Sequence, residues 1–190
     1  MLRVIVAFFF GFDWLSPASV VLSPLDRFMP CTPGLAVRYR MLRDGVETGE
    51  VIERVEGRGT ERATCVLARE TKGAGGVQRQ RFAREHLPDR ISDAGPVELP
   101  LAFRPPILKA PIRAGQRWHF NGVDSRIATT TATFELAGVR LGDVVRIVSR
   151  PTEGGANDTT SEYAPGVGLV RVRRGGFELR AVQVIPEVLP

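Results

Sequence analysis

Leu35-Ala36-Val37-Arg38-Tyr39-Arg40-Met41 is the stretch that decides the fold. Val37, Tyr39 and Met41 alternate with Arg38 and Arg40, and this period of two is typical of a strand with one buried face. Asp44-Gly45 follows closely and predicts a turn. The segment therefore predicts a half-buried strand that ends at a tight turn.

Similar segments recur at short, regular spacing along the chain, separated by Gly, Pro, Asn and Asp. They cover 51–55, 63–69, 78–84, 97–103, 116–120, 127–136, 144–150, 161–163, 168–173 and 177–185. Apolar residues nowhere keep a period of 3.6 long enough for a long helix. We therefore expect an all-β protein with few short helices, near 23–29 or 84–87.

The two halves of the chain match each other at a constant shift of 81 residues, without gaps. The shift places Pro30, Gly34, Val37 and Tyr39 on Pro111, Gly115, Trp118 and Phe120, Val66, Leu67 and Arg69 on Ile147, Val148 and Arg150, and Phe82-Ala83 on Tyr163-Ala164. Because one shift serves a turn, a core strand and an aromatic strand, it favours a duplication. The pseudo-repeats would cover about 30–104 and 111–185 of one domain over 19–190.

Each pseudo-repeat would form one antiparallel meander with a single apolar face, and the two faces would cover each other. The expected fold is an antiparallel sandwich or a half-open, curved barrel. A Pro-rich bridge over 99–108 joins the halves. Since proline has no amide hydrogen, Pro105-Pro106 should lie at a sheet edge or in the connection.

Residues 1–18 have the features of a cleaved secretory signal peptide. Arg3 precedes an apolar run from Val4 to Phe12, and Ser16-Pro17-Ala18 offers small residues for cleavage after Ala18. The run is shorter than the roughly 20 apolar residues of a transmembrane helix, so we expect no membrane span in the mature chain. A buried first strand is the alternative interpretation. We expect a bacterial protein that is periplasmic or secreted.

Cys31 and Cys65 are the two cysteines of the chain. In an oxidising compartment they could pair, and the bond would stabilise the fold by about 2–4 kcal/mol. They could equally be separate buried thiols that act as small hydrophobic side chains. The sequence leaves both interpretations open.

Recognisable catalytic patterns are missing from the sequence. His86 and His119 are its two histidines, and His119 on a strand would point away from its neighbours Trp118 and Phe120. The chain has no Gly-x-Ser-x-Gly elbow, no phosphate loop followed by lysine and no paired zinc-ligand spacing. We therefore predict a non-enzymatic protein with no catalytic residue, no metal site and no cofactor.

The formal charge of +5 comes from arginine rather than lysine. Five arginines on or beside expected strands could share a basic face: Arg79, Arg81, Arg171, Arg173 and Arg174. Nucleic acid is not expected as a partner, because the aromatics that would stack on bases occupy expected core positions and export separates the chain from nucleic acid. Anionic lipid or glycan is the better functional interpretation, and plain solvation of strand faces is the simpler one.

Two motifs in the second half resemble those of a family of uncharacterised exported bacterial β proteins. Tyr163-Ala164-Pro165-Gly166-Val167-Gly168-Leu169-Val170 resembles their signature, and Gly115-Gln116-Arg117-Trp118-His119-Phe120 resembles their Gly-x-x-Trp-x-aromatic start. The first half departs from both motifs. More distantly, the chain is similar to the LolA-like superfamily, whose half-open barrels carry lipoproteins or lipids. The resemblance covers mainly 111–185 and implies a fold without catalytic residues.

These observations predict an exported binding module that holds an apolar or amphiphilic ligand, such as a lipid or an acyl chain, or else a protein partner. Five aromatic residues are expected to line its interior: Tyr39, Phe82, Trp118, Phe120 and Tyr163. The same five could instead fill a solid core. The alternative function is a structural or interaction protein of the bacterial envelope without a small-molecule ligand.

Overall fold

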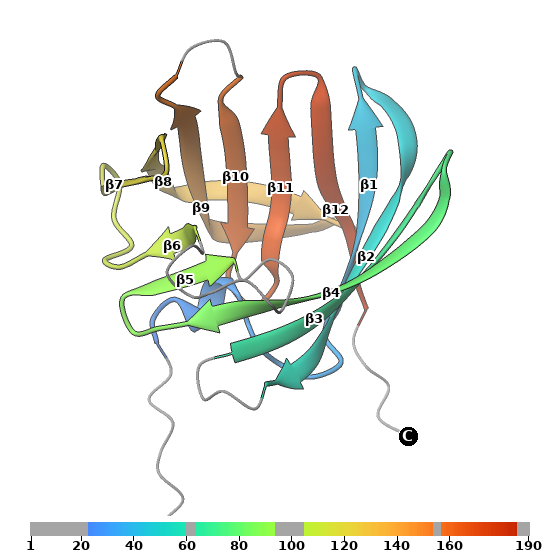
Figure 1. Ribbon diagram of the computed structural model, residues 1–190, viewed down its shortest axis with the longest axis horizontal. Helices are drawn as coiled ribbons and strands as arrows, with labels where there is room; N and C mark the ends of the chain where they lie inside the picture. Colours follow the sequence, from blue (N-terminus) through green and yellow to red (C-terminus); the bar gives the residue numbers. More distant parts are fainter. Residues whose placement is uncertain (1–22, 60–63, 94–104, 154–156, 186–190) are drawn as a thin grey trace, which may run out of the picture.

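The computed structural model describes residues 23–59, 64–93, 105–153 and 157–185, and these residues form a strongly curved antiparallel sheet (Figure 1). One 3-10 helix, η1 (Asp26–Phe28), precedes the strands. The strands are β1 (Ala36–Arg43), β2 (Val46–Arg58), β3 (Thr64–Gly73), β4 (Gly76–His86), β5 (Arg90–Asp93), β6 (Pro106–Lys109), β7 (Arg117–Phe120), β8 (Val123–Leu136), β9 (Val139–Pro151), β10 (Thr159–Ala164), β11 (Gly168–Arg174) and β12 (Phe177–Ile185). The predicted leader and the predicted strand over 97–103 lie outside the described residues.

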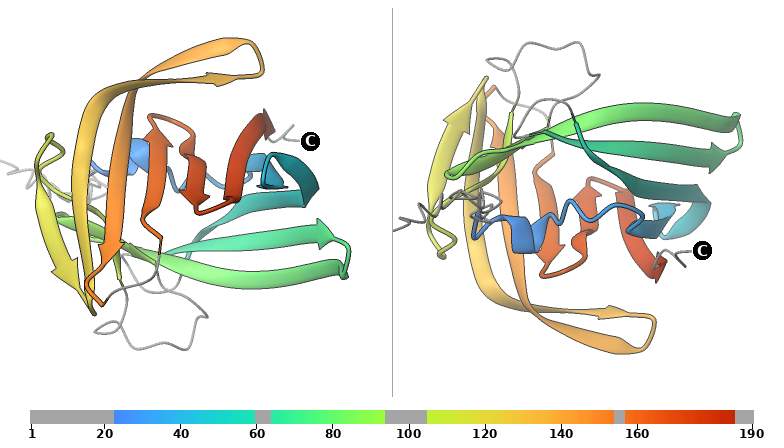
Figure 2. Two further views of the ribbon diagram at one scale, coloured as in Figure 1. Left: turned by 90° about the horizontal axis from the view of Figure 1, so that it is seen from above. Right: turned by 90° about the horizontal axis from the view of Figure 1, so that it is seen from below.

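The twelve strands form one sheet in the order β6-β5-β4-β3-β2-β1-β12-β11-β10-β9-β8-β7. All chain neighbours except β6 and β7 are therefore sheet neighbours, and β1 pairs with β12 to join the two ends of the described chain. The sheet curls into a nearly closed barrel (Figures 1 and 2). The all-β prediction is confirmed, and of its two architectures the protein adopts the barrel.

The opening hairpin forms as the sequence predicts. Asp44 and Gly45 have φ angles of 51° and 82°, which is the left-handed conformation that a two-residue turn between twisted strands requires. In β1, Val37 and Tyr39 are buried and Arg40 is exposed. The alternation of apolar and basic residues thus sets which side chains enter the barrel.

The β8–β9 hairpin is too long for the barrel wall, and its outer end lies across β10, β11 and β12, away from β3 and β4 (Figure 2). It brings the Phe134 ring to 5.1 Å from the Arg171 guanidinium. Glu162, only 1% exposed, is neutralised there by Arg146 at 2.7 Å and Arg171 at 3.4 Å. The hairpin therefore covers the ion pairs of Glu162 on this side of the sheet.

The segment before β1, residues 23–35, lies across one end of the barrel and closes it (Figure 2). We call this segment the plug. Leu25, Phe28 and Met29 of this plug pack against Tyr163 and other buried residues of the barrel. The backbone amide of Gly166 donates a hydrogen bond to the Arg27 carbonyl at 2.6 Å, and a disulfide joins Cys31 to Cys65 of β3. The plug is thus fastened to both halves of the wall.

Asp26 and His86 make a further polar contact of the plug with the barrel. His86 Nδ1 lies 2.8 Å from Asp26 Oδ1, and the His86 side chain is only 6% exposed. Burial lowers the pKa of His86, and this effect outweighs the hydrogen bond to Asp26, which would raise it. The folded protein therefore favours a neutral His86.

We expect the unfolding free energy to fall as the pH drops below about 6.5, the usual pKa of histidine in an unfolded chain. In that range the unfolded state binds a proton that the folded state resists, because the folded pKa is lower. Urea denaturation between pH 5 and pH 8 measures the effect. In the His86→Gln variant this part of the pH dependence should vanish. If the unfolding free energy of the variant depends on pH as steeply as that of the wild type, His86 is not the group responsible.

The predicted duplication stays a prediction, but the two halves share one local geometry. The amides of Gly34 and Gly115 donate to the carbonyls of Val55 and Ile127, and both glycines have a positive φ, 80° and 87°. The gapless shift does not hold everywhere. Leu67 is buried like Ile147, whereas its partner in the shift, Val148, is half-buried.

Candidate ligand-binding site

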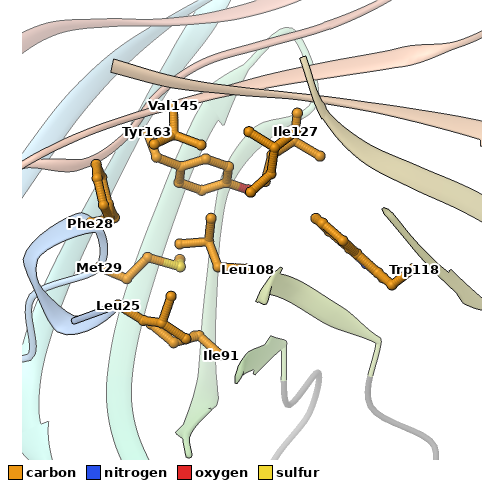
Figure 3. Close-up of a cluster of buried hydrophobic side chains, with 10 residues drawn as sticks. Leu25, Phe28, Met29, Ile91, Leu108, Trp118, Ile127, Val145 and Tyr163 are labelled. Carbon is orange, nitrogen blue, oxygen red and sulfur yellow. The ribbon is translucent and has the colours of Figure 1, made fainter. Parts of the chain in front are cut away.

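Four of the five aromatic residues predicted to line the interior lie in three separate clusters, and Phe120 belongs to none of them. Trp118 and Tyr163 belong to the cluster that contacts the plug, Tyr39 to a second cluster and Phe82 to a third. Figure 3 shows Tyr163 at the centre of the first cluster, with plug residues on one side and Trp118 apart on the other. Phe120 is half-buried beside Trp118.

Tyr39 and Tyr163 are packed core residues. They are 2% and 4% exposed, and burial raises the pKa of both phenols above its ordinary value. The Tyr39 hydroxyl donates a hydrogen bond to the Leu169 carbonyl at 3.0 Å. The Tyr39 hydroxyl thus joins β1 to β11 and is used within the fold rather than for a ligand.

Phe82 lies against a buried ionic cluster. The guanidiniums of Arg69 and Arg84 are 4.5 and 5.4 Å from the centre of its ring. Both donate to Glu53, Arg69 Nη2 at 2.9 Å and Arg84 Nη2 at 2.5 Å. Burial alone would raise the pKa of the Glu53 carboxyl, but the two guanidiniums outweigh it and lower the pKa. Phe82 is thus enclosed by ion pairs rather than by an open cavity.

The space beside Tyr39, Glu53 and Arg84 is nearly filled. The cavity there measures about 20 Å³, room for about one water molecule. Around these residues the barrel interior is a packed core, and an acyl chain has no place between them.

Trp118 and Phe120 line a pocket of about 300 Å³ at the seam, which is where the sheet ends at β6 and β7. Pro105 and Pro106 form its other wall. Because proline has no amide hydrogen, this edge offers no backbone donor at two consecutive residues. The Trp118 indole bridges the seam instead, and its Nε1 donates to the Pro106 carbonyl at 3.2 Å. The predicted edge position of Pro105-Pro106 agrees with this arrangement.

The pocket also contains two hydroxyl groups. Ser125 Oγ and Ser149 Oγ lie 2.8 Å apart, and both residues line the pocket. In such a pair one hydroxyl donates to the other, and the hydrogen of the accepting hydroxyl is left for another acceptor. The seam pocket thus combines aromatic walls with one available O–H donor, which suits an amphiphilic group.

Sequence reasoning missed the polar residues of this pocket, Ser125 and Ser149, and the plug. An apolar pattern at Leu25, Phe28 and Met29 was present in the sequence as a signal for the plug. No local pattern marks the two serines, because they meet only through the register of β8 with β9, where Ser125 is opposite Ser149.

The two histidines have structural partners. His86 binds Asp26 of the plug, and His119 Nδ1 lies 2.8 Å from Asp124 Oδ1 on the outer face. His119 points away from Trp118 and Phe120, as expected from its position on a strand. Within the described residues no helix is long and apolar enough to cross a membrane.

Fold and site together define a plugged, nearly closed twelve-stranded barrel with one open seam. No protein-family model matches the chain, and no curated protein matches it.

Two solved structures are similar to the chain. One is a predicted exported protein with a YmcC-like fold from Bacteroides fragilis, with a TM-score of 0.51 and 12% identity over 81% of this chain and 96% of that chain. The other is a predicted lipoprotein from Parabacteroides distasonis, with a TM-score of 0.48 and 11% identity over 82% of this chain and 97% of that chain. The first shows that the chain shares the YmcC-like fold.

Proposed function

We propose that this chain is an exported, non-enzymatic binding module that takes an apolar or amphiphilic ligand at the seam pocket. The observation that carries the proposal is the opening between β6 and β7, where Trp118 and Phe120 face a pocket of about 300 Å³. Ligand sites are typically concave and aromatic, with a few polar groups. Here the hydroxyl pair of Ser125 and Ser149 supplies the polar groups.

Three observations support export. Residues 1–18 have the pattern of a secretory signal. Cys31 and Cys65 form a disulfide, a bond that persists mainly in oxidising compartments. The similar protein from Bacteroides fragilis is described as a predicted exported protein. The proposed location is the periplasm or the outside of a bacterial cell.

The size of the pocket limits the ligand. Pockets for small molecules measure about 300–1,000 Å³, so this one is at the lower end. A carrier like those of the LolA-like superfamily encloses lipid inside a half-open barrel, but here the interior near Tyr39 is filled. We propose that one short apolar arm of the ligand enters the seam and that the rest stays outside.

The test uses the fluorescence of Trp118. The chain has two tryptophans, and Trp14 belongs to the predicted leader, so the mature protein over 19–190 keeps Trp118 as its one indole. We expect a short-chain brominated fatty acid to quench this fluorescence saturably. Phe120→Ser should weaken the binding by about tenfold, because an aromatic contact is worth about 1.5 kcal/mol.

Phe177→Ser is the matched control, since Phe177 is 36% exposed in another hairpin. It should leave the affinity unchanged. Quenching that never saturates, or equal weakening by both variants, would disprove a site at the seam.

The packing of the interior favours a second candidate function, an interaction protein of the bacterial envelope without a small ligand. Tyr39, Phe82 and Tyr163 are each less than 8% exposed. Native mass spectrometry of the purified protein separates the two candidates. A bound lipid or other amphiphile supports the module, whereas a bare mass together with no quenching supports the interaction protein.

A further inference from the structure

A second hollow, of about 580 Å³, lies on the outer face of β7, β8 and β9. Its charged lining comes from Arg117 and His119 of β7, Asp124 and Arg126 of β8, Arg150 of β9, and Asp158. Trp118 and Phe120 point from the same strand β7 toward the seam pocket. Trp118 and Ser125 line both spaces, but the charged side chains give the outer hollow a different chemical character.

Two arginines occupy paired positions on the neighbouring strands β7 and β8 of this hollow. Arg117 of β7 is directly opposite Arg126 of β8 in the register. Opposite residues of an antiparallel pair have Cβ atoms about 4.5–5.5 Å apart, and like charges at such positions repel each other. Both side chains are exposed to solvent.

The carboxylates of the hollow are bound to other partners. Asp124 Oδ1 lies 2.8 Å from His119 Nδ1, and Asp158 Oδ2 lies 2.7 Å from Arg150 Nη2. Hydrogen bonds from Arg150 are the main reason for the low pKa of Asp158, and Arg126 adds a smaller effect. Among the described residues, neither Arg117 nor Arg126 forms an ion pair within 4 Å.

We propose that Arg117 and Arg126 together bind a phosphate-type oxyanion in this hollow, either free phosphate or the headgroup of an anionic lipid. A guanidinium presents a planar fork of N–H donors that matches two oxygens of one anion. An oxyanion held between two such forks accepts hydrogen bonds from both and replaces their repulsion by attraction. The site goes beyond the proposed seam function and does not depend on it.

Titration of the full chain with inorganic phosphate tests the site, with sodium chloride holding the ionic strength constant. Amide chemical shifts near Arg117 and Arg126 should move saturably with phosphate. Arg117→Gln and Arg126→Gln should each weaken the affinity by about tenfold or more, since a hydrogen bond to a charged group is worth about 1.5–3 kcal/mol.

Arg79→Gln is the matched control, because it also removes one outer-face positive charge, but from an arginine bound to Glu70 at 2.8 Å. It should leave the phosphate affinity unchanged. If Arg79→Gln weakens binding as much as Arg117→Gln does, the effect is general charge and the proposal is wrong.

Vesicles distinguish the two sources of the anion. Sedimentation with phosphatidylglycerol vesicles, but not with phosphatidylcholine vesicles, and its loss in Arg117→Gln would assign the site to a lipid headgroup. Saturable shifts with phosphate and no sedimentation would assign it to a free phosphate compound. Absence of both responses would overturn the proposal, whatever the result of Trp118 quenching.

Discussion

Glu53→Gln should lower the unfolding free energy by about 3–5 kcal/mol, the largest effect that we expect from one substitution. The Glu53 side chain is 7% exposed and is the hydrogen-bonded countercharge of Arg69 and Arg84. Glutamine keeps the size but removes the charge, so a guanidinium that is 12% exposed at Arg84 is left without its partner. Asp93 is opposite Arg84 in the register, but no hydrogen bond joins them in the described structure.

Urea denaturation followed by far-UV circular dichroism measures this loss. Glu70→Gln is the control, because Glu70 pairs with Arg79 at the surface, where water screens the charges, and it should change stability little. Glu53→Leu combined with Arg84→Met should recover part of the loss, since apolar side chains tolerate burial. Equal effects of Glu53→Gln and Glu70→Gln would contradict the assignment of a buried cluster.

The ion pairs of Glu53 also make the stability of the protein depend on pH in the acid range. Because the folded pKa of Glu53 is lowered, its contribution to stability is complete above about pH 4.3, the usual pKa of glutamate. The contribution is lost as the pH falls through the lower folded value. The Glu53→Gln variant lacks this carboxyl, so the difference in stability between the two proteins should shrink below about pH 4.

Removal of the Cys31–Cys65 disulfide should lower the unfolding free energy by about 3–4 kcal/mol. The bond joins residues 34 apart, and in the chain-entropy model a loop of that length gives this stabilisation. For a domain of this size the melting temperature should fall by roughly 10 °C. The disulfide also fastens the plug to β3, so Cys31→Ala/Cys65→Ala should expose the residues that pack beneath the plug.

Reducing agent provides the comparison for this prediction. Dithiothreitol should bring the wild type to the stability of the Cys31→Ala/Cys65→Ala variant and leave the variant unchanged. Complete reduction, checked by thiol titration, without any change in the melting temperature would show that the bond adds no stability.

Much of the wall could be predicted from the sequence because each strand carries its own signal. The alternation at Val37, Arg38 and Tyr39 defines β1, and Asp44-Gly45 defines its turn. β5 and β6 were not predicted. Each has four residues, and neither shows the alternation of apolar and polar residues that marks β7, a strand of equal length.

The site could be predicted only in part. Aromatic residues were expected inside the barrel, but the sequence could not tell Trp118 at the seam from Tyr39 in the filled interior. That difference depends on where the sheet stops, at β6 and β7, which no local pattern in the sequence marks. The ion pairs of Glu53 depend on the register of β2, β3 and β4, which no local pattern reveals.

The strand order has a consequence for how the barrel forms. In the described chain, every ladder except that between β1 and β12 joins strands that follow each other in sequence. Hairpins close short loops at little entropic loss, whereas the β1–β12 contact must bring together residues such as Ala36 and Ile185 across most of the chain. We therefore expect the hairpins between consecutive strands to form early and the pairing of β1 with β12 to form last, as the slow step.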